Sequence, residues 1–241
     1  MADASIQRVN YGADPHQFFE LWLPEGTRIG SAVMIHGGFW RSRYDLFHVN
    51  PFCAALAAKG VATANLEYRR VGQLGGGWPG SFEDVLAGVR AASNILGNPP
   101  VVIGHSAGGH LALRMSSEPV PLRAVIALAP VADLRLAYAL NLSNGAVAEF
   151  LGATPDSAPE RYDEACPSNR SSSIPRMLVH DTEDEDVPIN ISRAFVEARR
   201  NDAVPPTLIE IPNATHMDLI DPETAAGAKV IDTVLRTMVV C

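Results

Sequence analysis

A five-residue motif places a serine between two glycines, directly after an apolar run. Gly104-His105-Ser106-Ala107-Gly108 follows Pro100 to Ile103 and precedes helix-forming residues that start near Leu111. A short strand, G-x-S-x-G and a helix in this order indicate a tight strand-to-helix turn that holds the serine in a strained position. Side chains at positions 104 and 108 would collide with neighbouring backbone in such a turn. If Ser106 is a nucleophile, the protein is a hydrolase or an acyl transferase.

Apolar runs alternate with amphipathic segments along the chain. Strands are predicted over residues 18–23, 32–36, 61–66, 101–104, 122–128, 177–180 and 207–211. Helices are predicted over residues 51–59, 81–96, 189–200 and 223–239. Ser81 and Asp84 form a candidate cap for the second of these helices. This order predicts an α/β fold with a mostly parallel sheet, helices on both faces and reactive groups at the carboxyl ends of the strands.

Two regions interrupt the alternation. Residues 72–80 are rich in glycine and predict a loop, and Gly75-Gly76-Gly77 lacks the Lys-Ser/Thr pair that a phosphate-binding loop needs. Residues 131–173 contain three prolines and a run of serines, which predicts a helix-and-loop insertion acting as a lid or cap. Because no repeat or linker divides the chain, we expect residues 1–241 to form a single domain.

Composition and charge exclude several classes of partner. The net charge of −8 argues against nucleic acid, which requires a basic face. Cys53, Cys166 and Cys241 are odd in number and widely spaced, so reduced thiols in a cytoplasm are expected. No apolar stretch is long enough to cross a bilayer, and Met1 to Ser5 do not resemble a signal peptide. We therefore expect a cytoplasmic protein that binds a small-molecule substrate, with neither nucleic acid nor membrane as a partner; a homodimer is compatible with the sequence.

A serine nucleophile needs a nearby base, and the base needs an orienting acid. In sheets of this kind the chain order is serine, acid, histidine. Of the three histidines after Ser106, only His216 lies in a loop beyond a further predicted strand, which suits the base. Packing or helix-capping roles are expected for His110 and His180.

The acid lies in the segment from Asp181 to Asp186, which contains five carboxylates. Composition alone does not choose among them. A calcium-binding loop is rejected because Asp186 stands where the sharp turn of that motif requires glycine. Most of these carboxylates are expected to be solvated, with one turned inward.

A glycine pair follows the strand predicted over residues 32–36. His36-Gly37-Gly38-Phe39-Trp40 can turn backbone amides toward a substrate, as an oxyanion hole requires. The expected donors are the N–H groups of Gly38, Phe39 and Ala107. Such a mechanism needs neither a metal nor an organic cofactor.

Together these motifs resemble the α/β-hydrolase fold and, within it, the kynurenine formamidase (arylformamidase) and small carboxylesterase group. That group is marked by H-G-G-x-W and G-H-S-A-G-G-H, which stand unbroken at residues 36–40 and 104–110. The resemblance extends to Tyr68-Arg69, to residues 76–79 and to residues 215–222, and so covers most of the chain outside 131–173. It implies a serine esterase or amidase that acts on a small ester, formamide or amide.

The resemblance also implies particular site residues. The family pattern H-G-x-x-D-x-x-V-P, aligned on His180 and Val187-Pro188, places the acid at Asp184, with Asp186 and Glu183 as alternatives. The implied triad is Ser106, Asp184 and His216. Asp181 departs from the family, which usually has glycine there.

Several aromatic and charged residues near the motifs are expected to pack in the core or to line the substrate site. Glu67, Tyr68 and Arg69 are expected to pack beneath the oxyanion loop. Trp40 and Trp78 either line the substrate site or pack in the core. A lactonase, a small-metabolite deacetylase, an acyl transferase and a non-catalytic binding protein of the same fold remain as alternatives.

Overall fold

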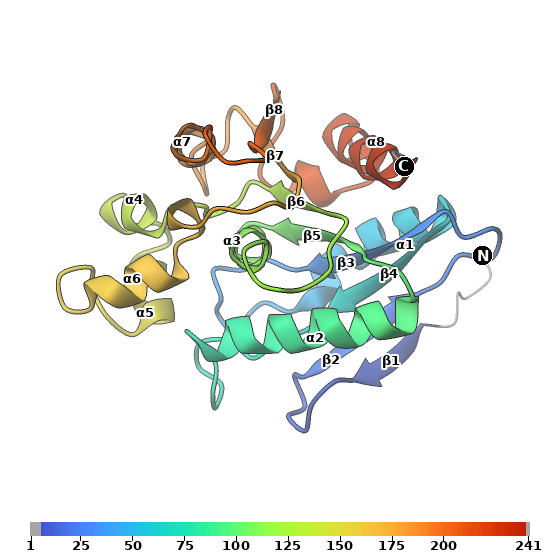
Figure 1. The fold of residues 1–241 in the computed structure, drawn as a ribbon, viewed down its shortest axis with the longest axis horizontal. Helices are drawn as coiled ribbons and strands as arrows, with labels where there is room; N and C mark the ends of the chain where they lie inside the picture. Colours follow the sequence, from blue (N-terminus) through green and yellow to red (C-terminus); the bar gives the residue numbers. More distant parts are fainter. Residues whose placement is uncertain (1–5, 240–241) are drawn as a thin grey trace.

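A single eight-stranded sheet forms the centre of the computed structural model, which describes residues 6–239 (Figure 1). Cys241 and the segment Met1 to Ser5, both considered above, lie outside the described residues. The strand order is β1-β2-β4-β3-β5-β6-β7-β8; the pairs β1–β2 and β2–β4 are antiparallel, and the remaining pairs are parallel. The strands are β1 Gln7–Asn10, β2 Phe18–Trp22, β3 Gly30–Ile35, β4 Val61–Leu66, β5 Val101–His105, β6 Ala124–Leu128, β7 Arg176–Asp181 and β8 Thr207–Ile211.

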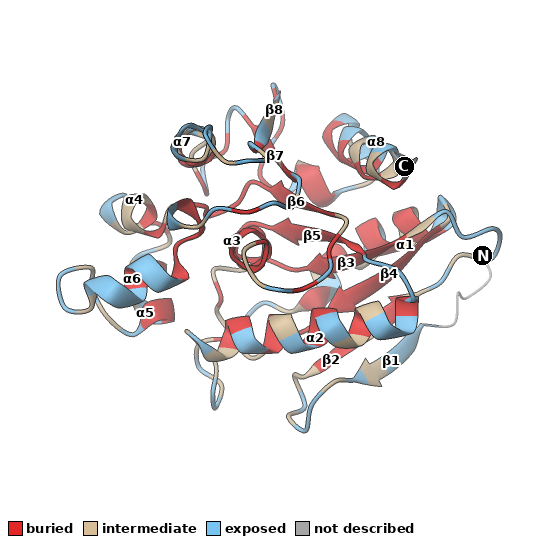
Figure 2. Ribbon diagram, viewed as in Figure 1, coloured by how far each residue is buried: buried red, intermediate tan, exposed pale blue. Residues whose placement is uncertain are grey.

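Helices cover both faces of the sheet, as the alternating pattern predicts. Helices α2, α3 and α7 pack on one face, and α1 and α8 pack on the other (Figure 1). Successive residues of a strand point to opposite faces of the sheet. Ile35 packs in the core beneath α2 and α3, whereas Met34 packs in the core beneath α1 and α8. Figure 2 shows the central strands buried throughout, α2, α7 and α8 exposed on their outer sides, and α3 buried. The five helices are α1 Asn50–Ala58, α2 Gly80–Leu96, α3 Ala107–Met115, α7 Asn190–Ala198 and α8 Ala225–Val239.

Within the described residues, no helix is both long and apolar enough to span a membrane. The helices on the two faces instead bury their apolar residues against the sheet.

The region 131–173 is a packed set of short helices. It contains α4 Leu134–Ala139, α5 Ala146–Leu151, α6 Pro159–Ala165 and a 3₁₀ turn over Pro167–Asn169. Phe150 of α5 stacks on Trp40 with ring centroids 4.4 Å apart, and its carbonyl accepts a 2.8 Å hydrogen bond from the Trp78 amide. Arg41 donates to Glu149 at 2.7 Å. These contacts fasten the insertion to the loop after β3 and to the loop before α2.

The expected cap of α2 is wrong. Pro79 is the N-cap residue, and it makes no side-chain capping bond. The Ser81 hydroxyl instead donates to the Arg69 carbonyl at 2.5 Å and accepts from the Gly77 amide at 3.0 Å. The Asp84 carboxylate accepts two bonds from the Arg69 guanidinium, at 2.6 and 2.7 Å. Ser81 therefore ties the glycine-rich loop to α2, and both side chains tie α2 to Arg69, which follows β4.

Two glycines allow the turn between β5 and α3 to pack against its neighbours. A Cβ atom on Gly104 would lie 2.3 Å from the carbonyl oxygen of Gly108. A Cβ atom on Gly108 would lie 2.2 Å from the Ile35 carbonyl oxygen. Register brings these parts together, because Ile35 of β3 pairs with Gly104 of β5. The loop after β3 therefore runs beside the start of α3.

Gly108→Ala should destabilise the fold strongly, because the added methyl group meets backbone atoms that cannot rotate away. We expect a loss of at least about 3 kcal/mol in the free energy of unfolding, at the high end for overpacked sites. Urea unfolding followed by circular dichroism measures it. Gly26→Ala is the matched control, because nothing lies within 4 Å of a Cβ atom there. Equal stability of the two variants would contradict this account of the turn.

Candidate active site

Ser106 lies between the carboxyl end of β5 and the first residue of α3. Its backbone angles are φ 55° and ψ −117°, a region that non-glycine residues rarely occupy. Its amide donates to the Leu128 carbonyl of β6 at 2.8 Å, and its carbonyl accepts from the His110 amide at 3.1 Å. Neighbouring elements thus hold the strained conformation that the motif predicts.

Backbone amides surround the space next to Ser106. Gly38 has φ +105°, and Phe39 and Trp40 also have positive φ angles of 49° and 56°. Within residues 6–239, neither Gly38 nor Phe39 donates its amide to another backbone carbonyl. Ala107 is the first residue of α3, so its N–H has no acceptor within the helix. The amides of Gly38, Phe39 and Ala107 are the predicted oxyanion-hole donors, and that role stays a prediction.

Buried side chains support the loop after β3 from below. The His36 ring stacks on Tyr68 with centroids 4.6 Å apart, and its Nε2 lies 3.0 Å from a Glu67 carboxylate oxygen. The Tyr68 hydroxyl donates to the His36 carbonyl at 3.1 Å. Glu67 and Tyr68 therefore lie where the sequence predicts. Arg69 does not, because it pairs with Asp84 of α2 instead.

His216 and Asp184 are joined directly. Nδ1 of His216 lies 2.6 Å from Oδ2 of Asp184, and both side chains are largely buried. His216 follows β8, and Asp184 lies in the turn after β7, so both come from the carboxyl ends of strands. Ser106 lines the same cavity as His216, but within the described chain no hydrogen bond joins its hydroxyl to the ring. Such bonds are often long in ligand-free enzymes and shorten when substrate binds.

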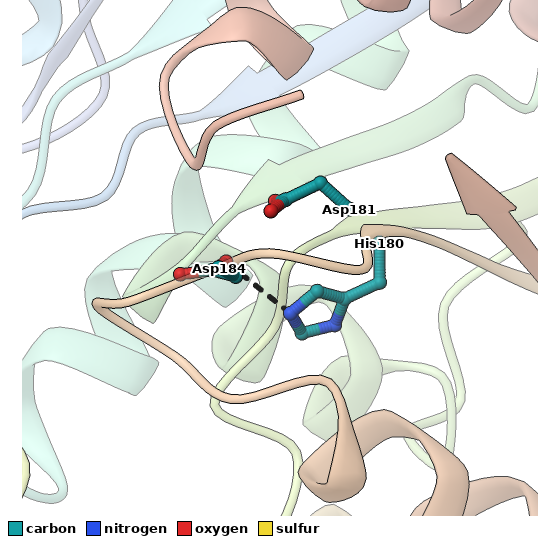
Figure 3. Close-up of side chains that lie close together, drawn as sticks. All are labelled: His180, Asp181 and Asp184. Carbon is teal, nitrogen blue, oxygen red and sulfur yellow. Dashed lines mark ion pairs between the residues drawn. The ribbon is translucent and has the colours of Figure 1, made fainter. Parts of the chain in front are cut away.

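Four donors converge on the Asp184 carboxylate. Oδ1 accepts from the amides of Asp186 and Val187 at 2.9 and 2.7 Å. Oδ2 accepts from His216 and lies 3.2 Å from Nε2 of His180 (Figure 3). Burial alone would raise the pKa of Asp184, but the hydrogen bonds from His180 and His216 hold it well below its usual range. Asp184 is therefore ionised at neutral pH.

Asp186 and Glu183, the alternative acids, are exposed. Among the described residues, Asp184 is the carboxylate that hydrogen-bonds to the His216 ring.

His110 and His180, for which packing or capping roles are expected, are both fully buried. His180 Nδ1 lies 2.7 Å from the Ser192 hydroxyl, and its Nε2 lies 2.8 Å from the Val187 carbonyl. His110 Nε2 lies 3.0 Å from the Ala165 carbonyl of α6, and burial lowers the pKa of His110 to about 3. His110 thus packs α3 against the insertion, whereas His180 also supports Asp184.

His105 is a supporting residue that the sequence analysis did not single out. Its ring lies 4.5 Å from the His216 ring, and its Nε2 donates to the His216 carbonyl at 3.1 Å. Burial and the adjacent His216 lower the pKa of His105 well below its usual value, so the ring is neutral. His105 stands at the first variable position of G-x-S-x-G, and the motif does not predict its contact with His216.

A cavity of about 200 Å³ opens over Ser106 and His216. Its lining includes the glycine loop after β3 and two of the predicted triad residues, together with residues that belong to no motif. The lining residues are Gly38, Phe39, Tyr44, His48, His105, Ser106, Asp186, His216 and Met217. No residue of 131–173 lines it, and larger hollows elsewhere, such as one of about 790 Å³ beside Ser116, contain none of the predicted triad.

Neither tryptophan lies in the cavity lining. Trp40 has no exposed surface; it stacks on Phe150 and meets His110 edge-on. Trp78 stacks on Phe82 of α2, with ring centroids 5.3 Å apart. The structure therefore places both rings in packing positions, and the aromatic substrate wall is not formed at this cavity.

Two groups of side chains have the spacing of metal ligands. One comprises His180, Asp181 and Asp184, the other Asp184, Asp186 and His216, each with ligand atoms within 4.8 Å of one another. In the first group, His180 Nε2 faces the Val187 carbonyl and therefore carries its hydrogen, which leaves no lone pair for a cation. In the second, Nδ1 of His216 faces Asp184. In both groups the histidine nitrogen and the Asp184 carboxylate are thus engaged in internal hydrogen bonds.

The strand order, the turn at Ser106 and the glycine loop define a protein of the α/β-hydrolase fold. The chain belongs to the BD-FAE family, an esterase-like family of this fold that matches residues 20–198. It is similar to Esterase LipC of Mycobacterium tuberculosis, with 27% identity over 255 residues that cover 89% of this chain. The alignment covers 60% of LipC, so this chain spans less than two thirds of that relative.

Solved structures share the fold over nearly the whole chain. A truncated carbohydrate esterase from gut microbiota has a TM-score of 0.82 at 19% identity, covering 98% of both chains. Esterase B of Lactobacillus rhamnosis has a TM-score of 0.80 at 20% identity, covering 97% of this chain and 84% of its own. Thermogutta terrifontis esterase 2, phosphoramylated by tabun, has a TM-score of 0.78 at 21% identity, covering 98% and 95%. These likenesses confirm the predicted fold, while the arylformamidase-like subfamily stays a prediction.

Proposed function

We propose that this protein is a serine hydrolase that cleaves small carboxylic esters through a covalent acyl-enzyme. The observation that carries the proposal is the 2.6 Å contact between His216 and Asp184 at a cavity that Ser106 also lines. A nucleophile, a base and an orienting acid are what this chemistry needs. Membership of an esterase-like family supports the same reaction class.

The proposed reaction has two steps. With Nδ1 held by Asp184, Nε2 of His216 takes the proton of the Ser106 hydroxyl as its oxygen attacks the ester carbonyl. Amides of the glycine loop and of Ala107 donate to the oxyanion, each worth roughly 3–4 kcal/mol of transition-state stabilisation. The alcohol leaves with a proton from His216. Water activated by the same ring then releases the acid and regenerates Ser106.

The cavity favours a small, uncharged acyl group. Its volume is about 200 Å³, and its exposed carboxylate belongs to Asp186. None of its lining residues is lysine or arginine. A substrate that carries a net negative charge would meet repulsion there without a lysine or arginine partner. We therefore rank neutral short-chain esters above formamides, lactones and amino-acid-derived substrates.

A substrate panel tests this order. Purified protein should hydrolyse p-nitrophenyl acetate and butyrate with a kcat/KM at least about tenfold above that for the octanoate ester or formylkynurenine, because long chains exceed the cavity. Ser106→Ala protein supplies the background rate for every substrate. A preference for formylkynurenine would restore the arylformamidase interpretation. A preference for lactones or for acyl transfer would assign the same machinery to another reaction.

A further inference from the structure

A second carboxylate lies buried beneath the proposed triad. Asp181 is the last residue of β7 and has no exposed surface. Within residues 6–239, neither oxygen of its carboxylate has a hydrogen-bond partner. An ionised carboxylate in such a place is costly, because nothing replaces the water it has lost.

Asp181 and Asp184 form an unequal pair. One carboxylate oxygen of each residue and a ring nitrogen of His180 all lie within 4.8 Å of one another. Figure 3 shows these three side chains close together. Asp184 accepts hydrogen bonds from His216 and two backbone amides and lies 3.2 Å from His180 Nε2, whereas within the described residues Asp181 accepts none. Two carboxylates this close do not ionise independently, and the better-solvated one keeps its charge. The proton of the pair therefore belongs on Asp181.

We propose that Asp181 is a positioning residue that carries a proton in acid and, once ionised, adds a second negative charge beneath the Asp184–His216 pair. That charge stabilises the imidazolium that His216 becomes during proton transfer, and so speeds the reaction. The inference rests on the proposed role of His216 as the base. The proton leaves to solvent as the pH rises, and no other group changes its bonding.

The groups around Asp181 fix the direction of its titration. Burial and the charge of Asp184 raise the pKa of Asp181 to about 6, while His180 and His216 partly oppose that rise. His105, which contacts His216 from β5, stays neutral and adds no charge. Because the pKa is raised, Asp181 is protonated below about pH 6 and ionised above it. Its contribution to catalysis is therefore absent in acid and present at neutral pH.

The test compares wild type with Asp181→Asn, which keeps the shape and never ionises. We expect kcat/KM of wild type to exceed that of the variant about tenfold near pH 8, and the ratio to approach one near pH 5. A purely structural defect would instead give a ratio that does not change with pH. Glu185→Gln is the matched control, because Glu185 is exposed on the same turn and loses the same charge. A ratio independent of pH overturns the proposal.

Infrared spectroscopy gives a readout that does not depend on catalytic activity. The carbonyl band of a protonated carboxylic acid should disappear as the pH rises through about 6. It is measured as the difference between Glu20→Gln protein and the Glu20→Gln/Asp181→Asn double variant, because ordinary carboxyl groups are partly protonated near pH 5 and Glu20 is the other described carboxyl group with a raised pKa. Absence of the band near pH 5 overturns the proposal. Failure of Ser106-dependent hydrolysis overturns the proposed function instead, and leaves the band as the test of Asp181 protonation.

Discussion

Ser106→Ala should lower kcat/KM for the preferred ester on the order of 100,000-fold, with stability little changed. Without the hydroxyl no acyl-enzyme forms, and only the slow background reaction assisted by the oxyanion loop remains. Initial rates on a p-nitrophenyl ester measure the loss, and the burst of product that marks acyl-enzyme accumulation should vanish as well.

The unfolding temperature of this variant is the necessary companion measurement. Ser106 already adopts a strained backbone, and alanine has nearly the same volume, so the turn should persist. A folded Ser106→Ala protein that keeps more than about a tenth of the wild-type rate would show that another group is the nucleophile.

Asp184→Asn should lower kcat on the order of 10,000-fold, because the amide no longer holds His216 in the productive tautomer. The contact to be lost is the 2.6 Å bond between Oδ2 and Nδ1. His180 and two backbone amides also bond to this carboxylate, so thermal unfolding must be measured alongside the rate.

Variants of the neighbouring carboxylates show whether activity depends on Asp184 itself or only on the total negative charge of this turn. Asp186→Asn should lower kcat no more than about tenfold, since its exposed carboxylate lines the cavity without bonding to His216. Glu185→Gln, exposed on the same turn, should match wild type. If the Asp186 variant loses more activity than the Asp184 variant, the acid assignment is wrong.

The sheet and the helices that cover it could be predicted from the sequence wherever hydrophobic patterning was strong. Parallel strands buried on both faces appear as short continuous apolar runs, and the helices between them have clear periodicity. For β4 the predicted bounds match the structure, Val61–Leu66. By contrast β1, Gln7–Asn10, is a mostly exposed edge strand with polar residues, so it gave no signal.

Local patterns failed where long-range partners compete for a side chain. Ser81 and Asp84 have the spacing of a helix cap, yet both bond to Arg69 from an earlier loop. The cavity residues Tyr44, His48 and Met217 come from loops far apart in the chain, and no spacing rule joins them. The missing hydrogen-bond partners of Asp181 likewise depend on how separate segments pack. The motifs thus indicated the triad candidates, but not the surfaces that surround them.

The most direct test of the account is covalent labelling of the native protein by a fluorophosphonate, with mass spectrometry to locate the adduct. An activated serine attacks phosphorus and displaces fluoride, whereas an ordinary hydroxyl does not react. We expect one adduct per chain, on Ser106, and none in the Ser106→Ala variant. A folded protein that stays unlabelled, or that carries the adduct on another serine, would contradict the claim that Ser106 is the nucleophile.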